Sequence, residues 1–152
     1  MKILKIKTLQ RKIGDLGERA ATLYLLLHGY LILKRNYTAH DAEIDIIAQR
    51  GNTTAFIEVK ARNVKGMEQM NSRPAAAVNA EKQRKIIKAS EHFMRQKKLK
   101  TRMRYDIIEV YLVGEADQIR VRDIKHLTNS FNLNTAYDAN YYYRRKKEGS
   151  NL

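Results

Sequence analysis

Three residues, Asp45, Glu58 and Lys60, could together hold a divalent cation against a phosphate group. Asp45 lies in the segment AEIDIIAQR and the other two lie in TTAFIEVKA, with Gly51-Asn52 between the two segments. Gly and Asn tolerate the backbone of a tight hairpin turn, and a two-residue turn would place Asp45 opposite Glu58. Opposed residues have Cβ atoms about 4.5–5.5 Å apart, so two carboxylates there require a cation or a shared proton. Mg²⁺ is a usual partner of clustered carboxylate oxygens.

The same turn predicts which side chains share a face of the hairpin, because successive strand residues alternate between faces. One face would carry Glu43, opposite Lys60, together with Asp45, Ile47, Phe56 and Glu58. The other face would be wholly apolar, with Ile44, Ile46, Ala48, Ala55, Ile57 and Val59. Lys60 would then lie beside the cation, where it could hold or help deprotonate an attacking water. The alternative is a solvated face on which Glu and Lys pair, but Ile47 and Phe56 on that face count against it.

Polar residues of two predicted helices could extend this site. Glu18 could complete the metal site, although a first-turn Glu favoured by the helix dipole explains it more simply. Lys82 and Gln83 precede an apolar helical stripe by one turn and could contact a phosphate near the helix N-terminus. A polar pair that points to solvent explains them equally well. For Asp106, in an apolar strand, a structural hydrogen bond to a turn is at least as good an explanation as a catalytic role.

The charge of the chain favours a polyanionic partner. Thirty Lys and Arg against 16 Asp and Glu give a formal net charge of +14, with a pI near 10.0. Such an excess binds nucleic acid through counterion release, and an anionic membrane surface is the second candidate. Basic residues crowd the chain start and the second long helix with its exit. They are Lys2, Lys5, Lys7, Arg11, Lys12, Arg84, Lys85, Lys88, Arg95, Lys97, Lys98, Lys100, Arg102 and Arg104.

The chain has no cysteine, which excludes disulfides, thiolate zinc sites and thiol catalysis. The first ten residues alternate Lys with apolar residues and lack the continuous apolar core of a signal peptide. The longest apolar stretch, Ala20 to Leu27, is too short to cross a bilayer. We therefore expect a cytoplasmic, soluble protein with no segment that spans a membrane.

The apolar periodicity predicts the elements that must position these residues. We expect helices over Asp15–His28 and from an Asn79 cap to about Lys98, the second with Ile86, Ile87, Ser90, Phe93 and Met94 as its inner stripe. We expect strands over Tyr30–Tyr37, Ala42–Gln49, Thr53–Ala61, Arg104–Val113 and Gln118–Ile124. Asn63 to Val78 would be a loop. Because a long helical crossover favours parallel pairing, the order predicts an α/β fold with a mixed central sheet of about five strands flanked by helices.

The ordered set of motifs resembles the YraN-type family of small bacterial proteins, which are predicted endonucleases related to archaeal Holliday-junction resolvases. The spacing of Asp45 and Glu58-Val59-Lys60 resembles the core of the PD-(D/E)xK nuclease superfamily. The matching stretches are GDLGERAATLYLLLHGYLILKRNY (14–37), AEIDIIA (42–48), FIEVKAR (56–62), RPAAAVNAEKQRKI (73–86) and RYDIIEV (104–110), with IKHLTNSF (124–131) a looser match. Ile44 stands where the superfamily name has Pro, and Ala42 replaces the Gly usually found before Glu-Ile-Asp.

The resemblance implies a restriction-endonuclease-like domain over residues 12–131. The polar residues from about Asn132 onward, with the run YYYRRKK, predict a basic, flexible tail over 132–152. It assigns Asp45, Glu58 and Glu18 to metal coordination, Lys60 and Gln83 to catalysis, and Glu43 to support of the metal-binding Asp. Nucleic acid would contact Lys82, Arg84, Lys85 and Arg62. Related resolvases imply a homodimer only by analogy.

We therefore expect a Mg²⁺- or Mn²⁺-dependent endonuclease that hydrolyses branched or single-stranded DNA. The alternative is a nucleic-acid-binding protein of the same fold that does not cut. A weaker third hypothesis is that the basic termini recognise acidic protein or membrane surfaces.

Overall fold

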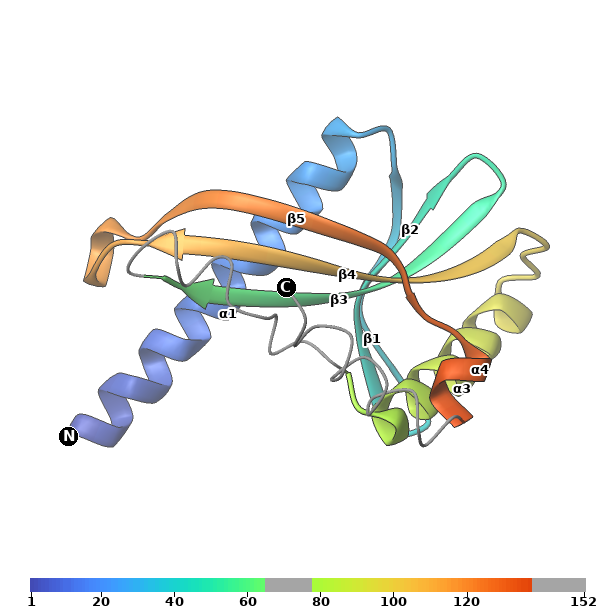
Figure 1. The fold of residues 1–152 in the computed structure, drawn as a ribbon, viewed down its shortest axis with the longest axis horizontal. Helices are drawn as coiled ribbons and strands as arrows, with labels where there is room; N and C mark the ends of the chain where they lie inside the picture. Colours follow the sequence, from blue (N-terminus) through green and yellow to red (C-terminus); the bar gives the residue numbers. More distant parts are fainter. Residues whose placement is uncertain (65–77, 138–152) are drawn as a thin grey trace, which may run out of the picture.

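The fold is an α/β arrangement of five strands and two long helices, seen in a computed structural model that describes residues 1–64 and 78–137 (Figure 1). In chain order the elements are α1 (Lys2–Leu27), β1 (Leu31–Ala39), β2 (Ala42–Arg50), β3 (Thr53–Asn63), α3 (Ala80–Gln96), β4 (Arg102–Val113), a short 3-10 helix η1 (Ala116–Gln118), β5 (Arg120–Phe131) and α4 (Leu133–Tyr137). The expected loop from Asn63 to Val78 lies almost wholly outside the described residues.

The strands form one sheet in the order β1-β2-β3-β4-β5. Only β3 and β4 pair in parallel, and the chain between them contains α3, which is the long crossover that a parallel pair requires. The other neighbouring strands are antiparallel and are joined by short connections. The predicted mixed sheet flanked by helices is confirmed, and this architecture is compatible with a restriction-endonuclease-like fold.

Each face of the sheet is covered by one long helix, so the protein has two apolar cores. Leu25 of α1 packs with Ile57 and Ile108 on one face, whereas Ile87 and Phe93 of α3 pack with other sheet residues on the opposite face. Figure 1 shows α1 (blue) crossing behind the twisted sheet and extending beyond it at its N-terminal end. No helix in the described part of the chain is long and apolar enough to span a membrane.

The start of α3 matches the prediction closely. The Asn79 side chain accepts a hydrogen bond from the Lys82 backbone N–H at 2.8 Å, which satisfies one of the donors that a helix N-terminus leaves free. The residues predicted as the inner stripe of this helix are all buried: Ile86, Ile87, Ser90, Phe93 and Met94.

Several boundaries differ from the sequence prediction, and three of the differences are large. Helix α1 begins at Lys2 rather than Asp15, because the alternating Lys and apolar residues before it are good helix formers with no proline among them. Strand β5 continues to Phe131 rather than ending at Ile124, through a polar segment whose outer face is exposed. The expected tail begins with helix α4, whose Ala136 is fully buried. The remainder, 138–152, lies outside the described residues.

Ile44 also departs from its predicted face. It packs in the core beneath α3 with Ile47 and Phe56, whereas Ile46 and Ala48 pack beneath α1. The prediction extended the regular β2–β3 ladder to Ile44. That ladder ends at the Ile46–Ile57 pair, so its alternation does not determine the face of Ile44.

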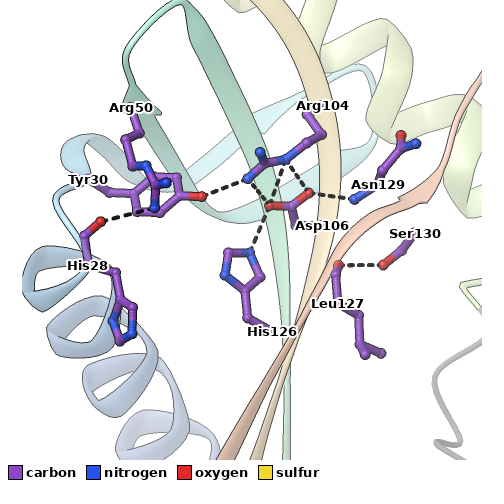
Figure 2. A network of polar contacts seen from close by, with 9 residues as sticks. All are labelled: His28, Tyr30, Arg50, Arg104, Asp106, His126, Leu127, Asn129 and Ser130. Atoms are coloured by element: carbon purple, nitrogen blue, oxygen red, sulfur yellow. Dashed lines mark hydrogen bonds and ion pairs between the residues drawn. The ribbon is translucent and has the colours of Figure 1, made fainter.

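Asp106 is a buried residue of β4 whose polar contacts connect β4 with β5 and, through Arg104, with the segment after α1 (Figure 2). The Arg104 guanidinium donates to both carboxylate oxygens, at 2.8 and 2.7 Å, and also donates to the Tyr30 hydroxyl at 2.8 Å. The carboxylate further contacts His126 Nε2 at 2.8 Å and accepts from the Asn129 backbone N–H at 2.9 Å. Burial alone would raise the pKa of Asp106, but the bonds to His126, Arg104 and Asn129 hold it below its usual value. Asp106 is therefore structural.

Candidate metal and phosphate site

The β2–β3 hairpin has the predicted register over its outer half. Arg50 pairs with Thr53, and the pairing continues without a shift to Ile46 with Ile57. Gly51 in the turn has a φ of 56°, a backbone conformation that glycine adopts at no steric cost. The prediction of a two-residue turn at Gly51-Asn52 is confirmed.

Beyond the Ile46–Ile57 pair the two strands separate, and this separation creates the site. The Asp45 side chain takes the place of a backbone partner, because its Oδ2 accepts the Val59 N–H at 2.7 Å. Glu43 does not lie opposite Lys60 as predicted; it is exposed and pairs with Thr38 of β1. The extrapolated hairpin was wrong here because β2 turns toward β1 while β3 continues along β4.

A cleft of about 840 Å³ occupies the space between the separated strands and the two long helices. Its walls come from α1, the β1–β2 turn, β2, β3 and the N-terminal turn of α3. The polar and charged residues around it are Gln10, Glu18, Asp41, Glu43, Asp45, Glu58, Lys60, Asn63, Asn79, Glu81, Lys82 and Lys85. The fold thus brings Glu18, Asp45, Glu58, Lys60 and Lys82 to one cleft.

Glu58 lies at the centre of the charge pairs in this cleft. Its Oε1 is 3.1 Å from Lys60 Nζ and 2.5 Å from Lys82 Nζ, and its side chain is only 8% exposed. Lys60 extends from the same strand, whereas Lys82 reaches across from the first turn of α3. One carboxylate oxygen of this buried residue therefore holds two ammonium groups, from lysine side chains that are 34% and 42% exposed.

The folded protein disfavours the ionised form of the Asp45 carboxyl, and neighbouring groups only partly offset this. Burial of the carboxylate and the nearby Glu58 raise the pKa of Asp45 to about 7, and Glu18 adds to the rise. The hydrogen bond from Val59 and the Lys82 charge act in the opposite direction. Near neutral pH the site can therefore bind a proton or a cation at Asp45.

Helix α1 brings Glu18 to the cleft because it packs very closely on β3. A Cβ atom at Gly17 would lie 2.4 Å from the Ala61 Cβ, so the residue before Glu18 must be glycine at this separation. Glu18 is not free, since its Oε2 is 3.4 Å from the Arg35 guanidinium of β1. This pair holds Glu18 at the cleft wall, near enough to Asp45 to raise the pKa of that carboxyl.

The remaining predicted residues are distributed around the site. Gln83 is buried and lies outside the cleft wall, where its amide donates to the Val78 carbonyl at 2.7 Å. Arg84 donates to the Ala136 carbonyl at 2.8 Å and so holds α4 against α3. Lys85 lines the cleft and pairs with Glu81 at 3.5 Å. Arg62 is half-buried on β3, close enough to Tyr111 to affect its ionisation.

Comparison with known proteins places this arrangement in a family. The pattern of a family described as "Uncharacterised protein family UPF0102" matches residues 17–110, which include every residue of the Asp45, Glu58 and Lys60 site. The chain belongs to the UPF0102 family. A UPF0102 protein of Clostridium acetobutylicum is 36% identical over 126 residues, covering 82% of this chain and 98% of the relative. A UPF0102 protein of Caldicellulosiruptor saccharolyticus is 37% identical over 80% of this chain and 98% of its own length.

The donors in this UPF0102 protein suit a hard divalent cation. Asp45 and Glu58 offer carboxylate oxygens, which are the ligands that Mg²⁺ and Mn²⁺ prefer, and two lysines compensate the charge that such a cation would neutralise. Within residues 1–64 and 78–137, no three acidic or histidine side chains are close enough to enclose an ion by themselves. The donor set therefore fits a cation that keeps several waters or takes phosphate oxygens, as Mg²⁺ usually does.

Sequence reasoning missed two features of the UPF0102 site. Lys82 was assigned to phosphate, but its primary contact is Glu58, which no local pattern indicates because the two residues lie on separate elements. Glu109 was not singled out, although it is a buried acid in the apolar strand β4. A charged residue inside the run DIIEVYLV is the signal that could have identified it.

Proposed function

We propose that this UPF0102 protein is a metal-dependent phosphodiesterase that cuts DNA. The observation that carries the proposal is the convergence of Asp45, Glu58, Lys60 and Lys82 on one cleft, where two acids and two lysines come from three elements. A surface salt bridge does not explain the arrangement, because Glu58 is buried and the pKa of Asp45 is raised to about 7. The resemblance of the Asp45 and Glu58-Val59-Lys60 motif to the PD-(D/E)xK nucleases supports the same chemistry.

Different residues of the cleft would bind the cation, orient the attacking water and bind the phosphate. When bound, Mg²⁺ or Mn²⁺ supplies Lewis-acid stabilisation of the charge that builds up on the phosphate. Asp45 and Glu58 would hold it, with Glu18 available from α1. Lys60 can orient an attacking water or stabilise the developing negative charge, since its ammonium lies beside Glu58. Lys82, in the first turn of α3, would hold a nonbridging phosphate oxygen together with the helix N-terminus.

The substrate is proposed from charge. A net charge of +14 favours a long polyanion, and Lys82 and Lys85 line the cleft beside the acids. Contacts from lysine and arginine to phosphates position a nucleic acid without reading its bases. We therefore expect structure-dependent cleavage of branched, flapped or single-stranded DNA.

The test is a cleavage panel with the purified full-length chain. Linear, flap, fork and four-way DNA substrates are incubated with Mg²⁺, Mn²⁺ or EDTA. We expect metal-dependent cleavage that Asp45→Ala and Lys60→Ala each abolish, with unchanged circular dichroism. Asp117→Ala is the matched control, because this acid is 92% exposed and lies outside the cleft.

Two results would contradict the proposal. Cleavage that survives Asp45→Ala would come from a contaminating nuclease. Salt-sensitive DNA binding by all variants, with no metal-dependent product on any substrate, would instead identify a nucleic-acid-binding protein that does not cut.

A further inference from the structure

Glu109 is a buried acid beside the cleft for which hydrolysis as described has no use. Its side chain is 2% exposed, and its Oε2 accepts a hydrogen bond from the Tyr111 hydroxyl at 2.7 Å. Within the described part of the chain, its other oxygen, Oε1, has no hydrogen-bond partner. A buried carboxylate oxygen without a partner is costly, and such groups are rare in folded proteins. Glu109 Oε1 is therefore available to accept a further hydrogen bond.

The sheet register places Glu109 directly next to Lys60. Strands β3 and β4 are parallel, with Lys60 paired to Glu109 and Glu58 paired to Ile107. Paired residues on neighbouring strands extend from the same face, so Lys60 has a carboxylate on each side: Glu58 along its own strand and Glu109 across the ladder. On the far side of β4, Lys125 of β5 pairs with Glu109 and is the second candidate partner.

The present contacts of Glu58 would have to change if Glu58 were to hold a divalent cation. Its Oε1 now holds the ammonium groups of both Lys60 and Lys82. A doubly charged ion on the same oxygen would repel both, since like charges a few ångströms apart in a partly buried cleft interact strongly. Lys82 can swing into the cleft or onto a phosphate, because its side chain is 42% exposed. Lys60 has an unused acceptor within its reach on β4.

We propose that Glu109 is a positioning residue that receives the Lys60 ammonium when Glu58 turns to a divalent cation. The inference rests on the proposed metal site and deepens it. Glu109 touches neither metal nor DNA. Glu109 is a second carboxylate with which the Lys60 ammonium can pair. The ammonium then stays near the cleft and no longer competes with the cation for the Glu58 carboxylate. The Tyr111 hydroxyl, whose pKa burial and Glu109 raise to about 12, stays protonated and holds the carboxylate in place.

The experiment is a double-mutant cycle on Mn²⁺ affinity, measured by titration calorimetry and electron paramagnetic resonance without DNA. The variants are Glu109→Gln, Lys60→Met and Lys125→Met, together with Glu109→Gln combined with each lysine substitution. Glu91→Gln of α3 is the matched control for loss of one acidic charge. We expect Glu109→Gln to raise the Mn²⁺ Kd by roughly tenfold, as loss of a group supporting a metal ligand does. In the Lys60→Met protein, Glu109→Gln should raise the Mn²⁺ Kd by about twofold or less, because only the long-range effect of the Glu109 charge is then lost.

The outcomes separate this inference from the proposed function. Equal loss of affinity in both backgrounds would show that Glu109 acts only as a fixed charge. Loss that disappears with Lys125→Met instead of Lys60→Met would assign Glu109 to Lys125. Either result would overturn the inference about Glu109 and leave the proposed metal site unaffected. A wild-type protein that binds no Mn²⁺ would contradict both the inference and the proposed metal site. If Glu109→Gln does not fold, Glu109→Asp retains the charge while shortening the reach, and an unchanged Mn²⁺ Kd would contradict the proposal.

Discussion

Replacing Asp45 with asparagine should stabilise the metal-free protein near pH 8, although the residue is central to the site. Asparagine keeps an oxygen that can accept the Val59 N–H, so the substitution removes the charge and little else. The charge is what the folded state disfavours, because burial and Glu58 raise the pKa of Asp45 from 3.8 to about 7. Sites built to bind cations often carry such a cost when empty.

The magnitude follows from the pKa. A rise from 3.8 to about 7 corresponds to roughly 4 kcal/mol of lost stability at pH 8, at about 1.4 kcal/mol per pKa unit. Movement of the two lysines and entry of water reduce this destabilisation. We therefore expect about half of it, or about 2 kcal/mol, to appear in the measured free energy of unfolding. The folded state binds the proton more tightly than the unfolded state, so the cost is absent below pH 3.8, grows as pH rises and is complete above pH 7.

The assay is thermal unfolding followed by circular dichroism, with EDTA, from pH 4 to pH 8. For a chain of this size, about 2 kcal/mol corresponds to a gain in Tm of roughly 4–8 °C for Asp45→Asn at pH 8. At pH 4 the two proteins should unfold together. Adding Mg²⁺ at pH 8 should raise the Tm of the wild type and leave that of the variant nearly unchanged.

Two results would refute this reasoning. A variant that is no more stable than the wild type at pH 8 would mean that Asp45 bears no electrostatic cost. A gain of the same size at pH 4 and pH 8 would mean that the effect comes from packing or hydrogen bonding rather than from ionisation.

Three further substitutions test the elements that hold the site. Gly17→Ala should cost about 1–3 kcal/mol, because its Cβ would lie 2.4 Å from that of Ala61, and displacing α1 should also slow cleavage. Asp106→Asn should cost about 3 kcal/mol by leaving buried donors without a charge partner. Since the folded-state pKa of Asp106 is lowered, its contribution is lost as pH falls through that pKa, and the variant should show a flatter acid limb in a plot of Tm against pH. Asn79→Ala should cost about 1 kcal/mol through loss of the α3 cap, measured by urea unfolding.

The register predicted from the sequence is correct only up to the point where β2 and β3 separate. The turn at Gly51-Asn52 and the alternation of side chains determine the register from Arg50–Thr53 to Ile46–Ile57. Extending that register one more pair predicted the proximity of Asp45 and Glu58 correctly. It also predicted a ladder that does not exist, because Asp45 itself takes up the Val59 N–H.

The apolar pattern predicted the interior of α3 and missed the ends of several other elements. The inner stripe of α3 repeats with the helical period, so its burial could be read from spacing. The end of β5 is rich in polar residues and helix α4 has only five residues, so pairing with β4 and packing on α3 decide their structure. Local composition carries little information about such tertiary contacts.

The sequence by itself determined the hairpin, the α3 cap, the positive charge and the identity of the acids and lysine at the site, because these depend on neighbours along the chain. Only the tertiary structure decided that Lys82 meets Glu58, that Glu18 is held by Arg35, and that Glu109 lies beside Lys60. These contacts join elements distant in sequence. Their geometry depends on strand separation, on the close packing of α1 at Gly17 and on the parallel register set by the α3 crossover.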